Sequence, residues 1–170
     1  YRIGADGGQR IVLYADPDSL VPLRTWDIAT PIRSTASSSV EYRRILEQVV
    51  REFEVEAVIV SSLIWHALDA LSLPLPTTLV FHDFYPICQA INPQFGTTCE
   101  RCTLDDLRVC AKSKPLNSIF IDQTSEAWHD MRSLYVDRLL KNQIELVAPS
   151  PSVVVTLNRL DARLKSLKTH

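Results

Sequence analysis

The stretch Thr77-Thr78-Leu79-Val80-Phe81-His82-Asp83 decides the fold. Its first five residues form a short apolar run that is partly β-branched, which predicts a buried β-strand. His82 and Asp83 follow this run directly. The strand therefore delivers a polar pair to one edge of a sheet, and we expect the functional site at that edge.

Two further apolar runs have the same character: Ala57–Val60 predicts a strand that is buried on both faces, and Ile144–Ala148 predicts a third strand. Segments with helical spacing of apolar residues separate and flank these runs. Their apolar positions are Tyr42, Leu46, Val49, Val50 and Phe53; Ile64, Ala67, Leu68 and Leu71; Trp128, Met131, Tyr135 and Leu139; and Val153, Leu157, Leu160, Leu164 and Leu167. This alternation predicts an α/β fold with a parallel sheet covered by helices.

Turn and cap residues indicate where elements begin. Gly7-Gly8 predicts the turn of a hairpin between Tyr1 and Tyr14, since no helical pattern follows these glycines. Ser38 with Glu41 three residues later predicts a capping box after a linker at 34–39. Ser150 followed by a proline predicts the start of the last helix.

Length and composition indicate one globular domain: the chain has 170 residues, 46% of them apolar and 22% charged. The net charge of −2 gives no electrostatic reason to expect nucleic acid as a partner. No apolar run approaches the ~20 residues of a membrane span. The chain begins at Tyr1 and shows no secretory pattern, so we expect a fragment of a longer cytoplasmic protein.

The segment 84–121 lacks a clear period and contains all four cysteines, so it is expected to be an irregular insertion. Cys88, Cys99, Cys102 and Cys110 have the spacing C-x10-C-x2-C-x7-C. Four thiolates can close a tetrahedral structural zinc site. Two disulfides, a redox pair or buried thiols are the alternatives.

The carboxyl ends of the three predicted strands carry Ser61-Ser62, His82-Asp83 and Pro149-Ser150. Ligands bind beyond such ends in open parallel sheets, so these groups are expected to converge on one crevice. Helix N-termini after Ser62 and Ser150 would offer N–H groups to an oxygen-rich ligand. The alternative for His82-Asp83 is a structural histidine beside a turn residue. His66 and His129 are interpreted as helix-surface or core residues.

Three segments in order resemble the N-terminal half of family 4 (group 1) GT-B glycosyltransferases, especially bacterial members that build surface polysaccharide. The segments are Val80–Cys88, Cys99–Cys102 and Leu146–Val153, and the resemblance covers roughly residues 55–165. It implies a Rossmann-like three-layer domain that holds the glycan or lipid-linked acceptor. A second, C-terminal domain would hold the nucleotide-sugar donor.

In that family a strand-end histidine lies near the reacting sugar, and here it matches His82. A serine at a later strand end matches Ser150. The resemblance therefore implies the acceptor-side domain of a retaining hexosyltransferase, inactive alone, at the inner face of the membrane. His82 would be catalytic, and Asp83, Ser61, Ser62 and Ser150 would bind substrate. The family's N-terminal strand with its glycine loop is not recognisable in residues 1–33, and the donor-binding domain is absent.

Two other functions fit parts of the pattern. One is a non-catalytic binding or scaffold module of the same fold, stabilised by zinc. The other is a receiver domain, which needs several carboxylates at strand ends. Asp83 follows a strand, but Ser61-Ser62 and Pro149-Ser150 supply none, so a receiver is disfavoured.

Overall fold

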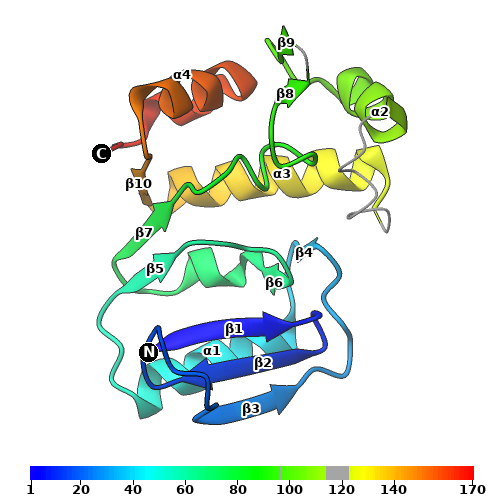
Figure 1. The fold of residues 1–170 in the computed structure, drawn as a ribbon. Helices are drawn as coiled ribbons and strands as arrows, with labels where there is room; N and C mark the ends of the chain where they lie inside the picture. The colour runs from blue at the N-terminus through cyan, green and yellow to red at the C-terminus, as the bar shows by residue number, and fades with distance from the viewer. Residues whose placement is uncertain (96, 114–122) are drawn as a thin grey trace.

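A computed structural model describes residues 1–95, 97–113 and 123–170 of the chain. The fold is mixed α/β, as the sequence predicts, and Figure 1 shows its elements in order. The parallel strands lie in the middle of the molecule, between an N-terminal antiparallel sheet and a region formed by α4 and the cysteine-bearing residues.

The central sheet contains β5 (Val58–Val60), β7 (Thr77–Val80) and β10 (Glu145–Val147), all parallel, in the order β10-β7-β5. The three predicted strands are therefore confirmed. The last residues of the chain extend this sheet, because Leu146 forms a parallel bridge with Thr169. Ile59 of β5 is 74% exposed, so the expectation that this edge strand is buried on both faces is wrong.

The N-terminal residues form an antiparallel sheet of β1 (Arg2–Asp6), β2 (Arg10–Tyr14) and β3 (Arg24–Asp27). Gly7 and Gly8 form the predicted hairpin turn, and both have positive φ angles. A Cβ at Gly8 would also overlap the backbone of Ile32, whose N–H donates to the Gly8 carbonyl at 2.8 Å. Only glycine fits this position without strain.

A second, small parallel sheet pairs β4 (Thr35–Ala36) with β6 (His66–Ala67), and the 3₁₀ helix η1 (Leu68–Ser72) follows. The predicted helix over 64–71 is therefore wrong in its first half. Leu63, Ala67, Leu68 and Leu71 are all buried, at a spacing that a strand followed by a 3₁₀ turn satisfies as well as an α-helix.

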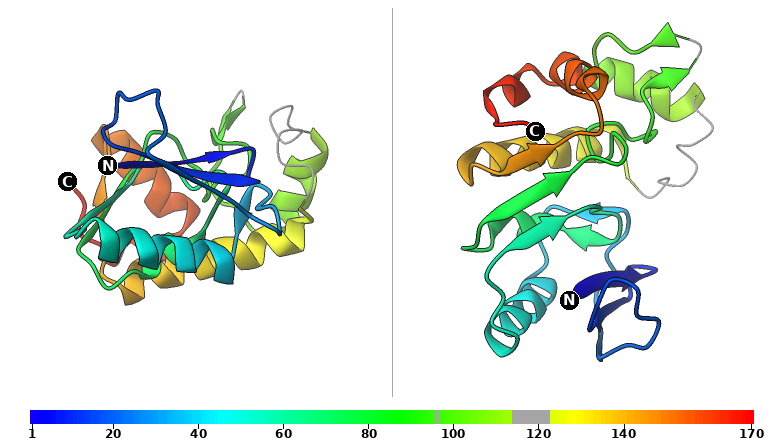
Figure 2. Two further views of the ribbon diagram at one scale, coloured as in Figure 1. Left: turned by 90° about the horizontal axis from the view of Figure 1, so that it is seen from below. Right: turned by 60° about the vertical axis from the view of Figure 1, so that its left-hand side comes forward.

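Helices α1 (Val40–Glu52) and α3 (Ser125–Lys141) lie on the same side of the parallel strands, and both contact η1 (Figure 2). Ser39 caps α1, and its hydroxyl accepts from the Tyr42 N–H at 3.2 Å. The predicted capping box of Ser38 and Glu41 is wrong. Ser38 donates to Asp69 at 3.1 Å instead, and Glu41 accepts from the Ala29 N–H at 2.9 Å.

The last helix, α4, spans Pro151–Leu160, and a separate 3₁₀ helix, η3 (Ala162–Ser166), follows it. The predicted single helix through Leu167 therefore ends early. Asp161 is extended, and its carboxylate accepts from the Arg163 N–H at 3.1 Å, which starts the second helix. Leu157, Leu160 and Leu164 are buried as expected.

We call residues 84–113 the cysteine segment. It contains the short strands β8 (Gln94–Phe95) and β9 (Thr97–Thr98) and the helix α2 (Leu104–Ser113), so the expectation of a wholly irregular insertion is wrong. The rest of the predicted insertion, together with residue 96, lies outside the described residues. Among the helices that the structure describes, none is long and apolar enough to cross a membrane.

Candidate functional site

The carboxyl ends of β5 and β7 meet at one edge of the sheet, because the two strands are parallel neighbours. Ser61, Ser62, His82 and Asp83 line the same very small pocket there, of about 10 Å³, together with Tyr85 and Pro86. The predicted convergence of these two strand ends is thus observed. Ser150 follows β10, one strand further along, and is not among the described residues that line this pocket.

His82 and Asp83 have different surroundings in this pocket. His82 is exposed at the end of β7. Asp83 is half-buried, and its carboxylate accepts from the Tyr85 backbone N–H at 2.8 Å. This bond closes a local turn, as aspartate side chains commonly do. Asp83 therefore shapes the loop at the strand end, while the His82 imidazole is available to a ligand.

The serines also differ from expectation. No helix begins after Ser62, whose hydroxyl accepts from the Ile64 N–H at 3.2 Å in a tight turn that leads into β6. The predicted helix N-terminus at this place is therefore wrong. Ser150 does precede α4, with Pro151 at its first position, but its hydroxyl contacts the Ser152 hydroxyl at 2.7 Å and caps no backbone N–H.

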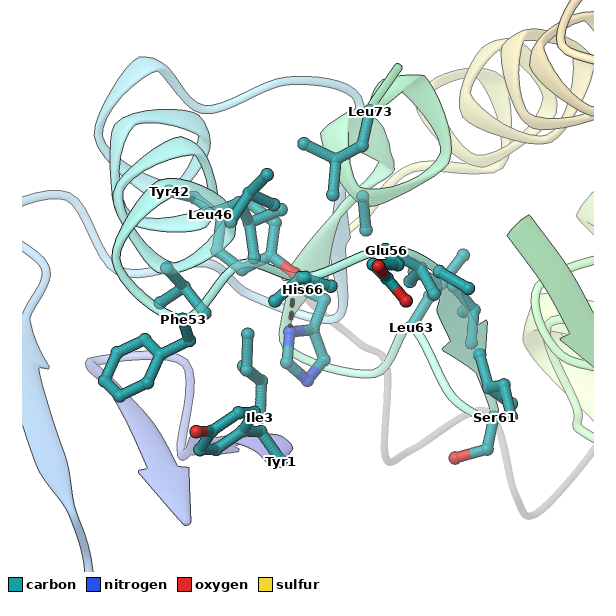
Figure 3. Close-up of a pocket in the computed structure, with 18 of the residues that line it drawn as sticks. Tyr1, Ile3, Tyr42, Leu46, Phe53, Glu56, Ser61, Leu63, His66 and Leu73 are labelled. Carbon is teal, nitrogen blue, oxygen red and sulfur yellow. Dashed lines mark hydrogen bonds between the residues drawn. The ribbon is translucent and has the colours of Figure 1, made fainter. Parts of the chain in front are cut away.

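A larger groove of about 390 Å³ adjoins the strand-end pocket, and the two share Ser61, Ser62 and Leu63. This volume falls in the range of small-molecule sites. Figure 3 shows the groove between α1 on one side and Tyr1 and Ile3 on the other. Its walls are mostly apolar, with a few polar groups, which is the usual composition of a ligand site.

His66 lines this groove together with the carboxylates of Glu54 and Glu56, and it was not predicted as a site residue. Its Nδ1 lies 2.9 Å from the Tyr42 hydroxyl (Figure 3). Burial lowers the pKa of His66 from 6.5 to about 4, so the imidazole is neutral at physiological pH. Burial, and then the charge of Asp69, raises the pKa of Tyr42. Both side chains therefore act as neutral hydrogen-bonding groups.

His66 was not predicted to line a groove because the apolar spacing around it indicated a helix, whereas the residue lies in strand β6. A histidine in a predicted helix gives no indication that it faces a groove, whereas the β4–β6 pairing fixes its side chain between α1 and β1. Tyr42 was predicted only as part of the apolar face of α1, and its hydroxyl contact with His66 needs a partner 24 residues away.

The four cysteines lie together, although none is joined by a disulfide and all four are among the described residues. They line one pocket of about 420 Å³. Burial, and to a lesser extent the neighbouring thiols, raise the pKa of Cys88 to about 12, and burial also raises the pKa of Cys102.

Within the part of the chain that the structure describes, no three His, Cys, Asp or Glu side chains are grouped closely enough to hold a metal ion. The thiols line the wall of the pocket without forming such a group. His129 lies outside both sites on α3, with its Nδ1 3.6 Å from Asp130, as expected of a surface residue.

The comparisons with known proteins give no match: no family model, no curated protein and no solved structure is similar to this chain.

Proposed function

We propose that the chain is the acceptor-binding, Rossmann-like domain of a retaining GT-B glycosyltransferase in surface polysaccharide or glycan synthesis. The observation that carries this proposal is the joint lining of one pocket by Ser61, Ser62, His82 and Asp83, at the carboxyl edge of a parallel sheet. Ligands of open α/β sheets bind at such edges. The order of the segments that resemble family 4 glycosyltransferases supports the same function.

In this proposal His82 contacts the transferring sugar or the acceptor and stabilises the charge that develops between them. Its exposure at the strand end suits that role. Ser61 and Ser62 offer hydroxyl groups to the acceptor, and Asp83 holds the loop that presents His82. Ser150 lies one strand further along the edge, where it serves a more distant part of the substrate.

The groove beside the pocket supports an acceptor with an apolar portion. Its walls include Leu46, Val49 and Phe53 from α1, and neutral His66 adds one hydrogen-bonding group. A lipid-linked glycan combines these features, with the sugar lying over the strand ends beside His82 and part of the lipid in the groove. The enzyme would work in the cytoplasm at the inner face of the membrane, and a second domain would bind the nucleotide-sugar.

The first test replaces His82 in the full-length protein and measures sugar transfer from a set of nucleotide-sugars to a lipid extract. We expect His82→Ala to reduce transfer by about 100-fold, as loss of one charge-stabilising group does in other enzymes. Its unfolding free energy should change by less than about 0.5 kcal/mol, because the side chain is exposed. His129→Ala, outside the pocket, is the matched control. Unchanged transfer in His82→Ala would contradict the role of this histidine.

The second test uses residues 1–170 alone. We expect no transfer from this fragment, because the donor phosphates bind mainly to the second domain. Turnover of a nucleotide-sugar by residues 1–170 alone would contradict the assignment of donor binding to a second domain.

A zinc-stabilised binding or scaffold module is the second candidate function. The observation that favours it is Asp83, which is engaged in a local turn and so leaves His82 without an orienting carboxylate among its described hydrogen bonds. The coding sequence beyond His170 distinguishes the two. A second α/β domain with paired glutamates supports the enzyme, and an unrelated domain supports the scaffold.

A further inference from the structure

The cysteine segment contains a group of side chains that sugar transfer does not use. Cys88 lies in the loop after β7, Cys99 and Cys102 lie between β9 and α2, and Cys110 lies on α2. All four line one pocket. The chain has no other cysteine. Three separate parts of the segment therefore bring every thiol of the protein to the same place.

Apolar packing supports the first part of this segment, where Tyr85, Ile87 and Ala90 are buried, but it gives residues 99–113 little support. Leu107 is the one buried residue of α2 within the described residues. Polar contacts to backbone carbonyls supply part of the remaining attachment: buried Gln89 donates to Leu107 O at 3.0 Å, and Arg132 of α3 donates to Cys102 O at 2.7 Å. A stretch with as few buried side chains as 99–113 commonly depends on a cross-link or a metal.

Arg132 gives a second, independent indication. It is 6% exposed, and within the described ranges no carboxylate lies within 4.0 Å of its guanidinium. The positive charge of Arg132 helps to lower the pKa of Asp161, but the Asp161 carboxylate forms its ion pair with the Arg163 guanidinium, at 2.7 Å. A buried cation without a compensating charge is costly. The guanidinium of Arg132 instead donates to the Cys102 carbonyl at 2.7 Å, which places a positive charge next to one of the four cysteines.

We propose that Cys88, Cys99, Cys102 and Cys110 bind one structural zinc ion as thiolates, with Arg132 balancing the negative charge of the four-thiolate centre. Zinc prefers four tetrahedral ligands in structural sites, and four cysteines are a common set. Each thiol loses its proton to solvent when it binds the metal. Zinc draws together side chains that otherwise line the pocket wall, so binding and ordering of the segment are coupled.

The carboxylates of the same pocket are weaker ligand candidates. Asp106 accepts from the Thr103 N–H at 2.9 Å and from the Thr103 hydroxyl at 2.7 Å, which helps to start α2. Glu100 is exposed. The thiols are thus the groups at this place that suit a soft, closed site. The proposal is independent of sugar transfer, since a scaffold module would need the same support.

The test measures metal content of the 170-residue chain purified without chelator. We expect about one zinc per chain in the wild type and less than about 0.2 in Cys110→Ser, which removes one ligand. Ser113→Ala is the matched control, since Ser113 lines the same pocket on the same helix and bonds only to Val109 O at 2.9 Å among its described contacts. It should retain zinc. Equal loss in both variants would overturn the ligand assignment.

Cobalt substitution and thiol titration keep the proposal testable if Cys110→Ser fails to fold. The cobalt form of the wild type should show the visible absorption of tetrahedral thiolate coordination. All four thiols should resist a thiol reagent until a chelator is added. Wild-type protein without metal and with reactive thiols would overturn the proposal, and so would iron in place of zinc.

Discussion

The parallel strands and the cysteine segment are held in place by different forces. Strands β5, β7 and β10 share one apolar core with helices α1 and α3, and this core includes fully buried Trp128, Tyr135 and Leu139 of α3. In the cysteine segment, residues 85–90 join this core, but 99–113 have one helix with a single described buried residue and polar contacts to carbonyl groups. Burial of regularly spaced apolar side chains therefore stabilises the sheet. Residues 99–113 depend instead on a few specific contacts, made by Leu107, Gln89 and Arg132.

Paired leucine truncations test this difference most strongly. Leu139 and Leu107 are both 0% exposed. Leu139→Ala should lower the free energy of unfolding by about 3 kcal/mol, because it leaves a cavity in the main core. Leu107→Ala should instead increase hydrogen exchange within 99–113 and leave exchange in the three parallel strands unchanged. Urea unfolding and hydrogen exchange measure the two effects. Equal changes in both regions would show that they unfold as one unit.

The pH dependence of stability tests the part of the molecule next to the central sheet, where His66 of β6 is buried. Folding lowers the pKa of His66 from 6.5 to about 4, so the unfolded chain takes up the proton first as the pH falls. The contribution of His66 to the free energy of unfolding is fully present above about pH 6.5 and is lost as the pH falls through 4. The loss attributable to this group is about 3 kcal/mol.

His66→Asn should reduce this loss, whereas His129→Asn should leave it unchanged. Urea unfolding at several pH values between 7 and 4 measures the difference. If the wild type and both variants lost the same free energy of unfolding between pH 7 and 4, His66 would not be shielded from water.

The smallest effect concerns the start of α1. Ser39→Ala should lower the unfolding free energy by about 1 kcal/mol, because it removes the hydroxyl that accepts from the Tyr42 N–H. Ser37→Ala, two residues earlier, should change it by less than about 0.5 kcal/mol. A larger loss in Ser37→Ala than in Ser39→Ala would contradict the observed cap.

The parts of the fold that sequence predicts are those with strong periodicity. The three parallel strands and helices α1 and α3 follow from apolar runs and stripes. The cap of α1 was misplaced by one residue because Ser38 and Ser39 are chemically equivalent in sequence, and only the contact of Ser38 with Asp69 separates them. Helix α2 was missed because its buried face is a single leucine.

The candidate site divides in the same way. Ser61, Ser62, His82 and Asp83 could be placed together from strand order alone, since parallel neighbours end at one edge. His66 could not, because its position depends on the pairing of two-residue strands that are far apart in the chain. The gathering of four cysteines was expected from spacing, but the buried Arg132 beside them comes from α3 and has no sequence signal.

The strand order of the central sheet has a consequence for the size of a ligand. Neighbouring strands in a sheet lie ~5 Å apart, so the ends of β5 and β10 are separated by about 10 Å, with β7 between them. The positions of the strand ends therefore set how long a ligand must be to reach each of them. A molecule that contacts Ser61 and His82 spans one interval, and a molecule that also reaches Ser150 must span two. The length of the ligand, as well as its chemistry, decides how many of the strand ends it can use.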